Sequence, residues 1–411
     1  MKLPAHGSSA AYLLDQLDAL QADDVDWKSG RAFGLAYYAG PDVLALATAA
    51  NARFQSANAL NTAAFPSLRR MQADVVAMLA DLLNGGPEAA GFMTTGGTES
   101  ILLAVKAART RGHERGVHAP EMVLPTSAHA AFEKAAAYFG VRSVRVPVRE
   151  DYRADPDAMA AAINASTVLL VASAPQYPQG VVDPVAEVAA LAAARDVNCH
   201  VDACMGGITL PMLERLGHRI PPFDFRVPGV TSISVDLHKY GYTVKGGSVI
   251  LHRNKELRRH QTFVTDNWLG GVYGSSGLLG TKSGGPIAAA WAVLSHLGED
   301  GYLRLTATAR AATEALAAGL RAIPGVRLVA EPDATLLAFT LDDADVGAVG
   351  DGLAERGWMV DQQKPPPSLH CTVNAVHAGV IPEFLGELRA VLDTVRGAGL
   401  RAAPAPYATT E

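Results

Sequence analysis

The sequence predicts an α/β fold with a large domain on a mostly parallel central sheet and a smaller C-terminal α+β domain. Two patterns predict it. Short apolar runs alternate with helical patterns between residues 91 and 251, as in βαβ units whose sheet is covered on both faces. After about residue 300 the pattern changes to a helix, two short strands and a final helix. With 411 residues, 49% of them hydrophobic, the chain can bury a large core.

The expected elements follow in chain order, and they define four parts. Residues 1–65 form an N-terminal segment that contributes to the active site, 66–300 the large domain, 301–400 the small domain, and 401–411 a mobile tail. Strands are expected at 91–94, 122–124, 144–146, 167–172, 197–201, 231–235, 248–251, 326–329 and 335–340. Helices are expected from Pro66, over 99–110, over 128–139 behind a Ser127 cap, from Pro156 behind Asp155, and over 184–195, 286–297 and 382–396.

Charge and cysteine content exclude several classes of protein. The net charge of −6 disfavours nucleic acid as a partner. Three cysteines cannot form a disulfide framework, which indicates a reducing cytoplasm. The N-terminus has no apolar signal region, and no apolar run reaches the length of about 18 residues that a transmembrane anchor needs. We therefore expect a cytoplasmic protein that acts on a small molecule.

The segment Ser234-Val-Asp-Leu-His-Lys-Tyr-Gly-Tyr242 follows an apolar strand-like run and carries the first chemical signal. A lysine in a half-dry pocket has a lowered pKa and a free amine, which suits Schiff-base chemistry. The competing interpretation is a surface lysine after a strand. Other motifs have to decide between these two interpretations of Lys239.

A glycine turn joins an expected strand to an expected helix at Thr94-Thr-Gly-Gly-Thr-Glu-Ser100. Glycines let the backbone approach a ligand, and the helix N-terminus offers free N–H groups to an anion. The turn lacks the Gly-Lys-Ser/Thr of a P-loop, so ATP is disfavoured. The plain alternative is a capped turn without a ligand.

An acid ends a later strand in Cys199-His-Val-Asp-Ala-Cys204. At the carboxyl end of a central strand, Asp202 could face a cationic ring nitrogen and keep it protonated. Zinc is the rival ligand, but strand alternation places His200 and Asp202 on one face and Cys199 on the other. We therefore predict no metal site.

His129, at the start of an expected helix, could lie flat on an aromatic cofactor or could simply cap or pack. A phosphate cradle, an acid for a ring nitrogen and a lysine for an aldehyde fit one ligand. They are the handles of pyridoxal 5′-phosphate (PLP).

These residues belong to a longer ordered pattern. Segments at residues 96–109, 173–180, 200–207, 236–246, 271–274, 280–286 and 364–370 occur in the order seen in the group II PLP-dependent decarboxylases. The chain resembles that family, and within it the sphingosine-1-phosphate lyases, over about residues 28–375. The resemblance implies PLP-dependent transferase fold type I and a homodimer whose active sites are shared between subunits.

The resemblance also implies a role for each matching residue. Lys239 would bind the cofactor covalently, Asp202 would pair with its ring nitrogen, and His129 would stack on the ring. Gly97, Thr98 and His238 would bind its phosphate, with Thr281 reaching in from the partner subunit. The remaining matches concern the substrate: Tyr177 near the reacting carbons, Lys245 at the substrate anion, Tyr273 from the partner, and Tyr37 and Asn58 in early motifs.

One position departs from the family pattern. Asn61 stands where the lyases usually have a histidine that handles the phosphate-bearing end of the substrate. An asparagine can donate a hydrogen bond to an anion but carries no charge and moves no proton near neutral pH. The departure bears on whether the substrate is sphingosine 1-phosphate itself.

Three reactions could use this site. The leading prediction is retro-aldol cleavage of an anionic β-hydroxy amine to an aldehyde and an amine, with Lys245 holding the anion and lowering the pKa of Lys239. The alternatives are α-decarboxylation of an amino acid and aldol-type joining in the reverse direction. A non-catalytic binding protein is disfavoured because Lys239, Asp202 and His129 are all present.

Overall fold

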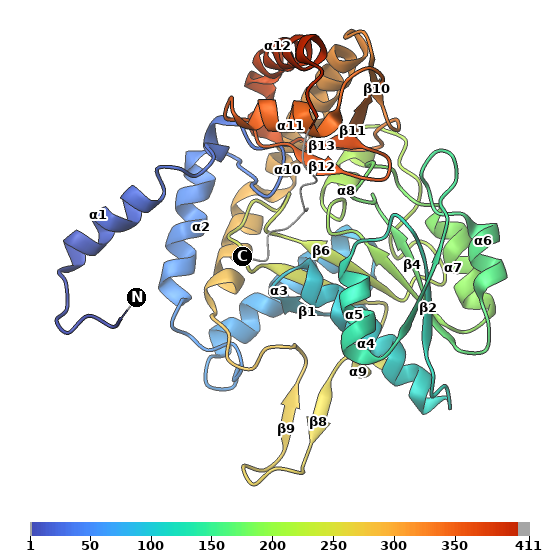
Figure 1. The fold of residues 1–411 in the computed structure, drawn as a ribbon. Coiled ribbons are helices and arrows are strands. Elements are labelled where there is room, and N and C mark those ends of the chain that lie inside the picture. The colour runs from blue at the N-terminus through green and yellow to red at the C-terminus, as the bar shows by residue number, and fades with distance from the viewer. Residues whose placement is uncertain (1, 402–411) are drawn as a thin grey trace.

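A seven-stranded sheet forms the centre of the large domain, with the strand order β1-β7-β6-β5-β4-β2-β3 (Figure 1). The structure is a computed structural model, and it describes residues 2–401. Apart from Arg401, the predicted mobile tail lies outside the described residues. The strands are β1 (Ala90–Thr94), β2 (Glu121–Pro125), β3 (Arg142–Val146), β4 (Thr167–Ser173), β5 (Asn198–Asp202), β6 (Ser232–Asp236) and β7 (Ser248–His252).

The sheet is mostly parallel, as predicted. Strands β3, β2, β4, β5 and β6 run parallel to one another, and β7 is antiparallel to both of its neighbours, β6 and β1. Every residue of β2, β4, β5, β6 and β7 is buried, and β4 shows this in its sequence, with five apolar residues in a row from Val168 to Ala172. The carboxyl ends of all strands except β7 therefore meet at one edge, where such sheets bind ligands.

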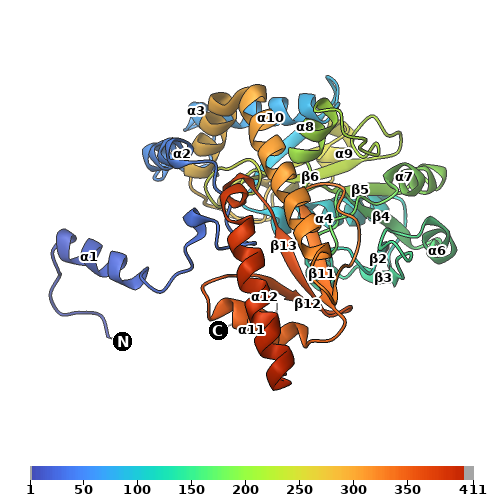
Figure 2. The same cartoon turned by 90° about the horizontal axis from the view of Figure 1, so that it is seen from above.

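Helices cover both faces of this sheet (Figures 1 and 2). They are α3 (Pro66–Leu82), α4 (Gly97–Glu114), α5 (Ala131–Phe139), α6 (Pro156–Ala162), α7 (Val185–Ala194), α8 (Thr209–Arg215) and α9 (Lys255–Arg259). The predicted starts at Pro66 and behind Asp155 are confirmed, and the Asp155 carboxylate accepts from the amides of Asp157 and Ala158. The predicted Ser127 cap is wrong, because α5 begins later and the Ala131 amide donates to Nδ1 of His129.

A second sheet and a second core define the small domain at the top of Figure 1. Strands β10 (Val326–Leu328), β11 (Leu336–Leu341), β13 (Ser368–Thr372) and β12 (Asp361–Gln363) lie in that order. Helices α11 (Val346–Ala354) and α12 (Ile381–Ala398), with the short η2 (Ala375–Gly379), complete it. Helix α10 (Gly285–Arg321) links both domains and breaks at Gly298, whose φ of 56° is left-handed, so the predicted stop near 297 becomes a kink.

The N-terminal segment contains α1 (Ala10–Leu20), η1 (Trp27–Ser29) and α2 (Pro41–Phe54). In Figure 1, α1 stands away from the body of the molecule, whereas Phe33 is buried in the small-domain core and stacks on Trp358. A hairpin of β8 (Phe263–Thr265) and β9 (Tyr273–Ser275) projects below the large domain, and the sequence patterns did not predict it. Within residues 2–401, no helix combines the length and apolar character needed to cross a membrane.

Candidate active site

A cavity of about 450 Å³ opens at the carboxyl edge of the large sheet, where loops from β1, β2, β4, β5 and β6 converge. Nine residues predicted from sequence line it together: Tyr37, Gly97, Thr98, His129, Tyr177, Asp202, His238, Lys239 and Lys245. Sequence positions more than 200 residues apart therefore face one space, as the strand order requires. We call this cavity the carboxyl-edge pocket.

The glycine turn after β1 forms one wall of the carboxyl-edge pocket. Helix α4 begins at Gly97, so its first amides have no partner within the helix and their positive end faces the pocket. A Cβ at Gly97 would lie 2.7 Å from Oδ2 of Asp236 and 2.8 Å from Sγ of Cys204. Only glycine fits there. Nearby, Nδ1 of His238 is buried and has no hydrogen-bond partner among the described residues. This wall offers donors to an anion.

Lys239 lies deep in the pocket beside a carboxylate that the sequence patterns did not single out. Its Nζ is 3.0 Å from Oδ2 of Asp236, whose Oδ1 accepts from the Ser248 hydroxyl. Burial alone would lower the pKa of Lys239, but Asp236, helped by Cys204 and Tyr37, raises it above its usual value. The expectation of a lowered pKa is therefore wrong for the protein without a ligand, because Lys239 is held as an ammonium group. Asp236, rather than Lys245, determines the direction of this shift.

Asp202 ends β5 on the other side of the pocket. Its Oδ1 accepts from the Cys204 amide at 3.1 Å and from the Ser234 hydroxyl at 3.3 Å. Both contacts hold the carboxylate in one orientation. Burial lowers the pKa of His129, against the opposing effect of Asp202, so its ring is neutral near pH 7. The Asp202 side chain and a neutral imidazole thus face the same space.

The side chains of the Cys199–Cys204 segment are buried and pack within the protein. Nδ1 and Nε2 of His200 contact the hydroxyls of Ser232 and Ser234, and burial lowers the pKa of His200 to about 4. Burial also raises the pKa of Cys199 to about 12, so its thiol stays protonated. In residues 2–401 no group of three or more His, Cys, Asp or Glu side chains is placed to hold a metal ion.

Lys245 is a second cation at the pocket mouth. Its Nζ donates to the Leu35 carbonyl at 2.5 Å and lies 5.3 Å from the centre of the Tyr37 ring. Burial and the charge of Lys239 lower its pKa to about 8. Lys245 therefore carries its charge near neutral pH but loses it within the range of an ordinary assay.

Four predicted site residues lie outside the carboxyl-edge pocket. Asn58 donates to the Thr281 hydroxyl at 3.3 Å, in a short bridge between residues 58 and 283. Asn61 is exposed, and its Oδ1 accepts from the amides of Ala63 and Ala64. Tyr273 lies on the projecting hairpin, edge-on to Trp268. Within one subunit, the fold does not bring these residues to Lys239.

The sequence patterns missed several pocket residues. Asp236 ends a buried strand, as Asp202 does, so the signal that identified Asp202 applies to it equally. Leu35, Cys204 and Met205 also line the pocket. Leu35 comes from the N-terminal segment with a left-handed φ of 60°, and no local pattern marks it as a site residue.

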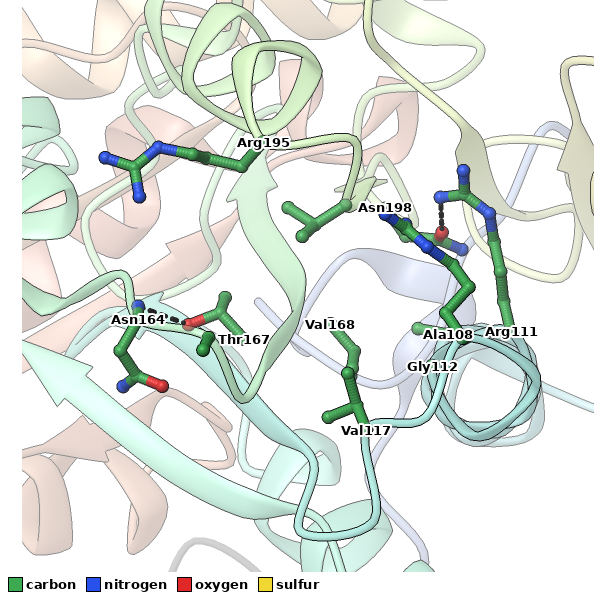
Figure 3. Close-up of a pocket in the computed structure, with 12 residues that line it drawn as sticks. Ala108, Arg111, Gly112, Val117, Asn164, Thr167, Val168, Arg195 and Asn198 are labelled. Carbon is green, nitrogen blue, oxygen red and sulfur yellow. Dashed lines mark hydrogen bonds between the residues drawn. The ribbon is translucent and has the colours of Figure 1, made fainter.

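A second cavity, also of about 450 Å³, lies at the opposite edge of the sheet, by the amino ends of β4 and β5 (Figure 3). Some of its polar groups pair with one another or with a nearby acid. The Arg111 side chain donates to Asn198 and to Asp196, and the backbone amide of Asn164 donates to the Thr167 hydroxyl. None of the residues predicted to be catalytic lines it. The carboxyl-edge pocket is therefore the candidate active site.

The residues that line the carboxyl-edge pocket include the chemical groups that a PLP site needs. The glycine cradle and the unpartnered His238 Nδ1 suit its phosphate, and the Asp202 carboxylate suits its ring nitrogen. Lys239 supplies the amine that an aldehyde needs. The neutral His129 ring faces the space between them.

Comparison with known proteins gives the same cofactor. The family described as "Pyridoxal-dependent decarboxylase conserved domain" matches residues 2–342. Rat sphingosine-1-phosphate lyase 1 is 42% identical over 390 residues, covering 94% of this chain and 69% of that protein.

Two solved structures are similar as well. The structure of sphingosine-1-phosphate lyase from Burkholderia pseudomallei has a TM-score of 0.92 at 40% identity, covering 97% of this chain and 94% of that one. Glutamate decarboxylase of Lactobacillus brevis shares the fold, with a TM-score of 0.85 at 20% identity, covering 96% and 95%. The chain therefore belongs to the pyridoxal-dependent decarboxylase family of fold type I and, within it, to the sphingosine-1-phosphate lyases, which use PLP.

Proposed function

We propose that this PLP-dependent lyase cleaves the Cα–Cβ bond of a phosphorylated β-hydroxy amine of the sphingosine 1-phosphate type. The products are an aldehyde from the Cβ side and a phosphorylated amine from the Cα side. One observation carries the proposal: a second lysine, Lys245, lies at the mouth of the pocket that holds Lys239 and Asp202. A cation beyond the cofactor site suits a substrate with an anionic end. The similarity to sphingosine-1-phosphate lyases supports the same substrate class.

PLP, when bound, supplies an electron sink for the pair released from the broken bond. Each pocket residue has a separate role in holding the cofactor. Lys239 holds the cofactor covalently, and Asp202 keeps a proton on the ring nitrogen. His129 packs on the ring, while Gly97, Thr98 and His238 bind the phosphate. Asp236 lies 3.0 Å from Nζ of Lys239 and would hold the proton that this amine carries in the absence of the cofactor.

The substrate's β-hydroxyl has to lose its proton as the bond breaks. Tyr177 lines the pocket and presents a hydroxyl that could take that proton. Tyr37 lies over Lys245 at the pocket mouth, so we place the substrate anion there. These assignments put the hydroxyl end and the anionic end of the substrate at different sides of one pocket.

The departure at Asn61 is consistent with this assignment of charge. The side-chain oxygen of Asn61 accepts hydrogen bonds from the amides of Ala63 and Ala64. Because its side chain is neutral, Asn61 adds no positive charge to the anion site. We propose that Lys245 provides the main electrostatic attraction for the substrate phosphate in this chain. The family histidine would have added to it.

We also propose a homodimer with shared active sites. The predicted residues outside the pocket, namely Asn58, Asn61, Tyr273 and Thr281, would reach the pocket of the partner subunit. The hairpin that carries Tyr273 exposes apolar side chains rarely left in water: Phe263, Val264, Trp268, Leu269 and Val272 are all more than half exposed. A second copy of the chain would cover them.

Localisation and domain roles are part of the same proposal. Three buried free cysteines, Cys199, Cys204 and Cys371, suit a reducing compartment, and we place the protein in the cytoplasm. Residues 66–300 would bind the cofactor, 301–400 would close one side of the site, and 1–65 would add Tyr37. Leu35 and Tyr37 already line the pocket, which supports the role of the N-terminal segment.

The dimer proposal predicts the effect of a change on the hairpin. Replacing both Trp268 and Leu269 by serine should shift the protein to monomers, because each exposed apolar side chain buried at an interface contributes about 1.5–3 kcal/mol. Sedimentation velocity would measure the shift, and activity should fall with it. Replacing the exposed Tyr138, which lies on α5 away from the hairpin, by serine is the control. A fully active monomer would contradict the shared site.

Lys245 gives a pH-dependent prediction. Its pKa of about 8 means that the charge is present below that pH and is lost as pH rises through it. KM for a phosphorylated substrate should therefore rise by up to about tenfold per pH unit above the pKa, with little change in kcat. In Lys245→Arg the charge persists and this rise should disappear; in Lys245→Met KM should be high at every pH. An unchanged KM profile in Lys245→Met would refute the role in anion binding.

Substrate class can be tested with matched compounds. The purified holoenzyme is given β-hydroxy amines of one chain length, with and without a phosphate, and aldehyde release is followed. We expect cleavage of the phosphorylated compound and a kcat/KM lower by about 10²-fold without the phosphate. Equal rates would show that the anion site does not select the substrate.

A further inference from the structure

The hydroxyl of Tyr177 contacts a carboxylate of the small domain. Tyr177 lies in the loop between β4 and α7 of the large domain and lines the carboxyl-edge pocket. Its hydroxyl donates to Oδ2 of Asp361, the first residue of β12, at 2.5 Å. The contact joins the two domains at the wall of the pocket, and it places an acid beside the hydroxyl of a tyrosine that lines the pocket.

The neighbouring strand holds Tyr177 from a second side. His370 of β13 lies opposite Asp361 in the antiparallel register, and its ring centre is 4.2 Å from that of Tyr177. Its two ring nitrogens contact the Pro178 carbonyl and the Thr372 hydroxyl. Burial lowers the pKa of His370 to about 4, so the ring is neutral near pH 7. It therefore packs against the phenol without competing for its proton.

The space around Asp361 is kept for its carboxylate. A Cβ at Gly34 would lie 3.1 Å from the same Oδ2 that accepts from Tyr177, so glycine leaves this oxygen room. Burial raises the pKa of Asp361, and the hydrogen bond from Tyr177 partly opposes the shift. The other titratable groups facing the carboxylate are His370 and Cys371, both uncharged near pH 7. No cation among these neighbours lowers its affinity for a proton.

We propose that Asp361 is a positioning residue and the final proton acceptor behind Tyr177 in the cleavage reaction. The inference rests on the proposed function and deepens it. Because the phenol proton points to Asp361, the Tyr177 oxygen presents lone pairs to the pocket. A substrate hydroxyl can donate to those lone pairs, whereas a phenol whose proton faced the pocket would compete with it.

The proton transfers balance. As the Cα–Cβ bond breaks, the substrate O–H bond also breaks, and its electron pair forms the C=O of the aldehyde. The proton bonds to the Tyr177 oxygen while the original phenol proton bonds to Asp361. After the aldehyde leaves, Tyr177 gives a proton to Cα, where it forms a C–H bond with the electron pair released from the Cα–Cβ bond, and Asp361 returns its proton to Tyr177. No net proton is gained or lost, and no other reactant is needed.

The test compares Asp361→Asn, Tyr177→Phe and the double variant in the holoenzyme. Asparagine is isosteric and its oxygen can still accept from Tyr177, but it cannot take the proton. We expect kcat to fall by about 10²-fold in Asp361→Asn, with KM within about twofold and the cofactor absorbance unchanged. The double variant should be no slower than Tyr177→Phe, since the two residues act as one unit. Asp342→Asn, which removes an exposed small-domain carboxylate paired with Arg327, should leave kcat unchanged.

Two further readouts separate a proton relay from a structural role. In the wild type kcat should rise with pH through the pKa of Asp361, which gives the pH profile an acid limb. This acid limb should be absent from both Asp361→Asn and Tyr177→Phe. The shifts in Tm of the two single variants should also be non-additive in the double variant, which reports the contact without any turnover.

The outcomes separate the inference from the proposed function. If the wild type releases aldehyde and Asp361→Asn keeps its kcat and acid limb, or the two losses multiply, the inference is overturned and the function stands. If the wild type releases no aldehyde, both are overturned. If Asp361→Asn does not fold, Tyr177→Phe decides alone, and an acid limb that persists in it overturns the relay.

Discussion

Replacing Lys239 by alanine is expected to lower turnover by at least about 10³-fold and to remove the visible absorbance of the lysine-bound cofactor. Lys239 lines the carboxyl-edge pocket, and its Nζ lies 3.0 Å from Oδ2 of Asp236. Alanine would also leave Asp236 buried without its cation, which destabilises the fold. Lost activity alone would therefore not separate chemistry from folding.

A matched variant makes that separation. Lys239→Arg keeps a positive charge beside Asp236 but cannot bond to the cofactor in the same way, so it should fold, show no lysine-bound absorbance and remain inactive. Lys255→Ala, on the exposed helix α9, is the control for loss of a lysine and should behave as the wild type. Turnover that survives in Lys239→Arg would show that another residue holds the cofactor.

The second large effect is expected at Asp202. In Asp202→Asn the side-chain oxygen can still accept from the Cys204 amide and the Ser234 hydroxyl, so the local structure should persist. The variant loses the negative charge that we propose keeps the ring nitrogen protonated, and such a partner shifts a pKa by about 1–3 units. We expect kcat to fall by about 10²-fold or more while the cofactor remains bound.

The measurement for Asp202 is kcat together with cofactor content. Asp224→Asn is a comparable buried acid far from the pocket, held by Arg226, and should reduce thermal stability rather than kcat in the folded fraction. Wild-type turnover in a fully loaded Asp202→Asn would contradict the pairing of Asp202 with the ring.

Much of the fold could be predicted because its signals are local. The buried strand β4 has an apolar run from Val168 to Ala172. Pro66 marks a helix start by its fixed backbone angle, and Asp155 marks one by its capping side chain. The Ser127 cap failed because a competing acceptor, His129 Nδ1, takes the Ala131 amide. The hairpin 263–275 was missed because its apolar residues are exposed in the single subunit, so no inward-outward alternation marks it.

The site also has some features that could be predicted from the sequence and others that could not. Residues at strand ends, such as Asp202 and Lys239, follow from sequence because the topology brings strand ends together. The state of Lys239 did not follow, since its pKa depends on Asp236 at 3.0 Å and on burial. Asp361 could not be predicted, because it reaches Tyr177 only through the docking of the two domains.

Product analysis tests the central claim most directly. The holoenzyme and Lys239→Arg are incubated with sphingosine 1-phosphate, and aldehyde, phosphorylated amine and carbon dioxide are quantified by mass spectrometry; an amino-acid panel is run in parallel. The account predicts aldehyde and phosphorylated amine in equal amounts from the wild type, neither from Lys239→Arg, and no carbon dioxide from the amino acids. Carbon dioxide from an amino acid, with no aldehyde from the phosphorylated substrate, would contradict it.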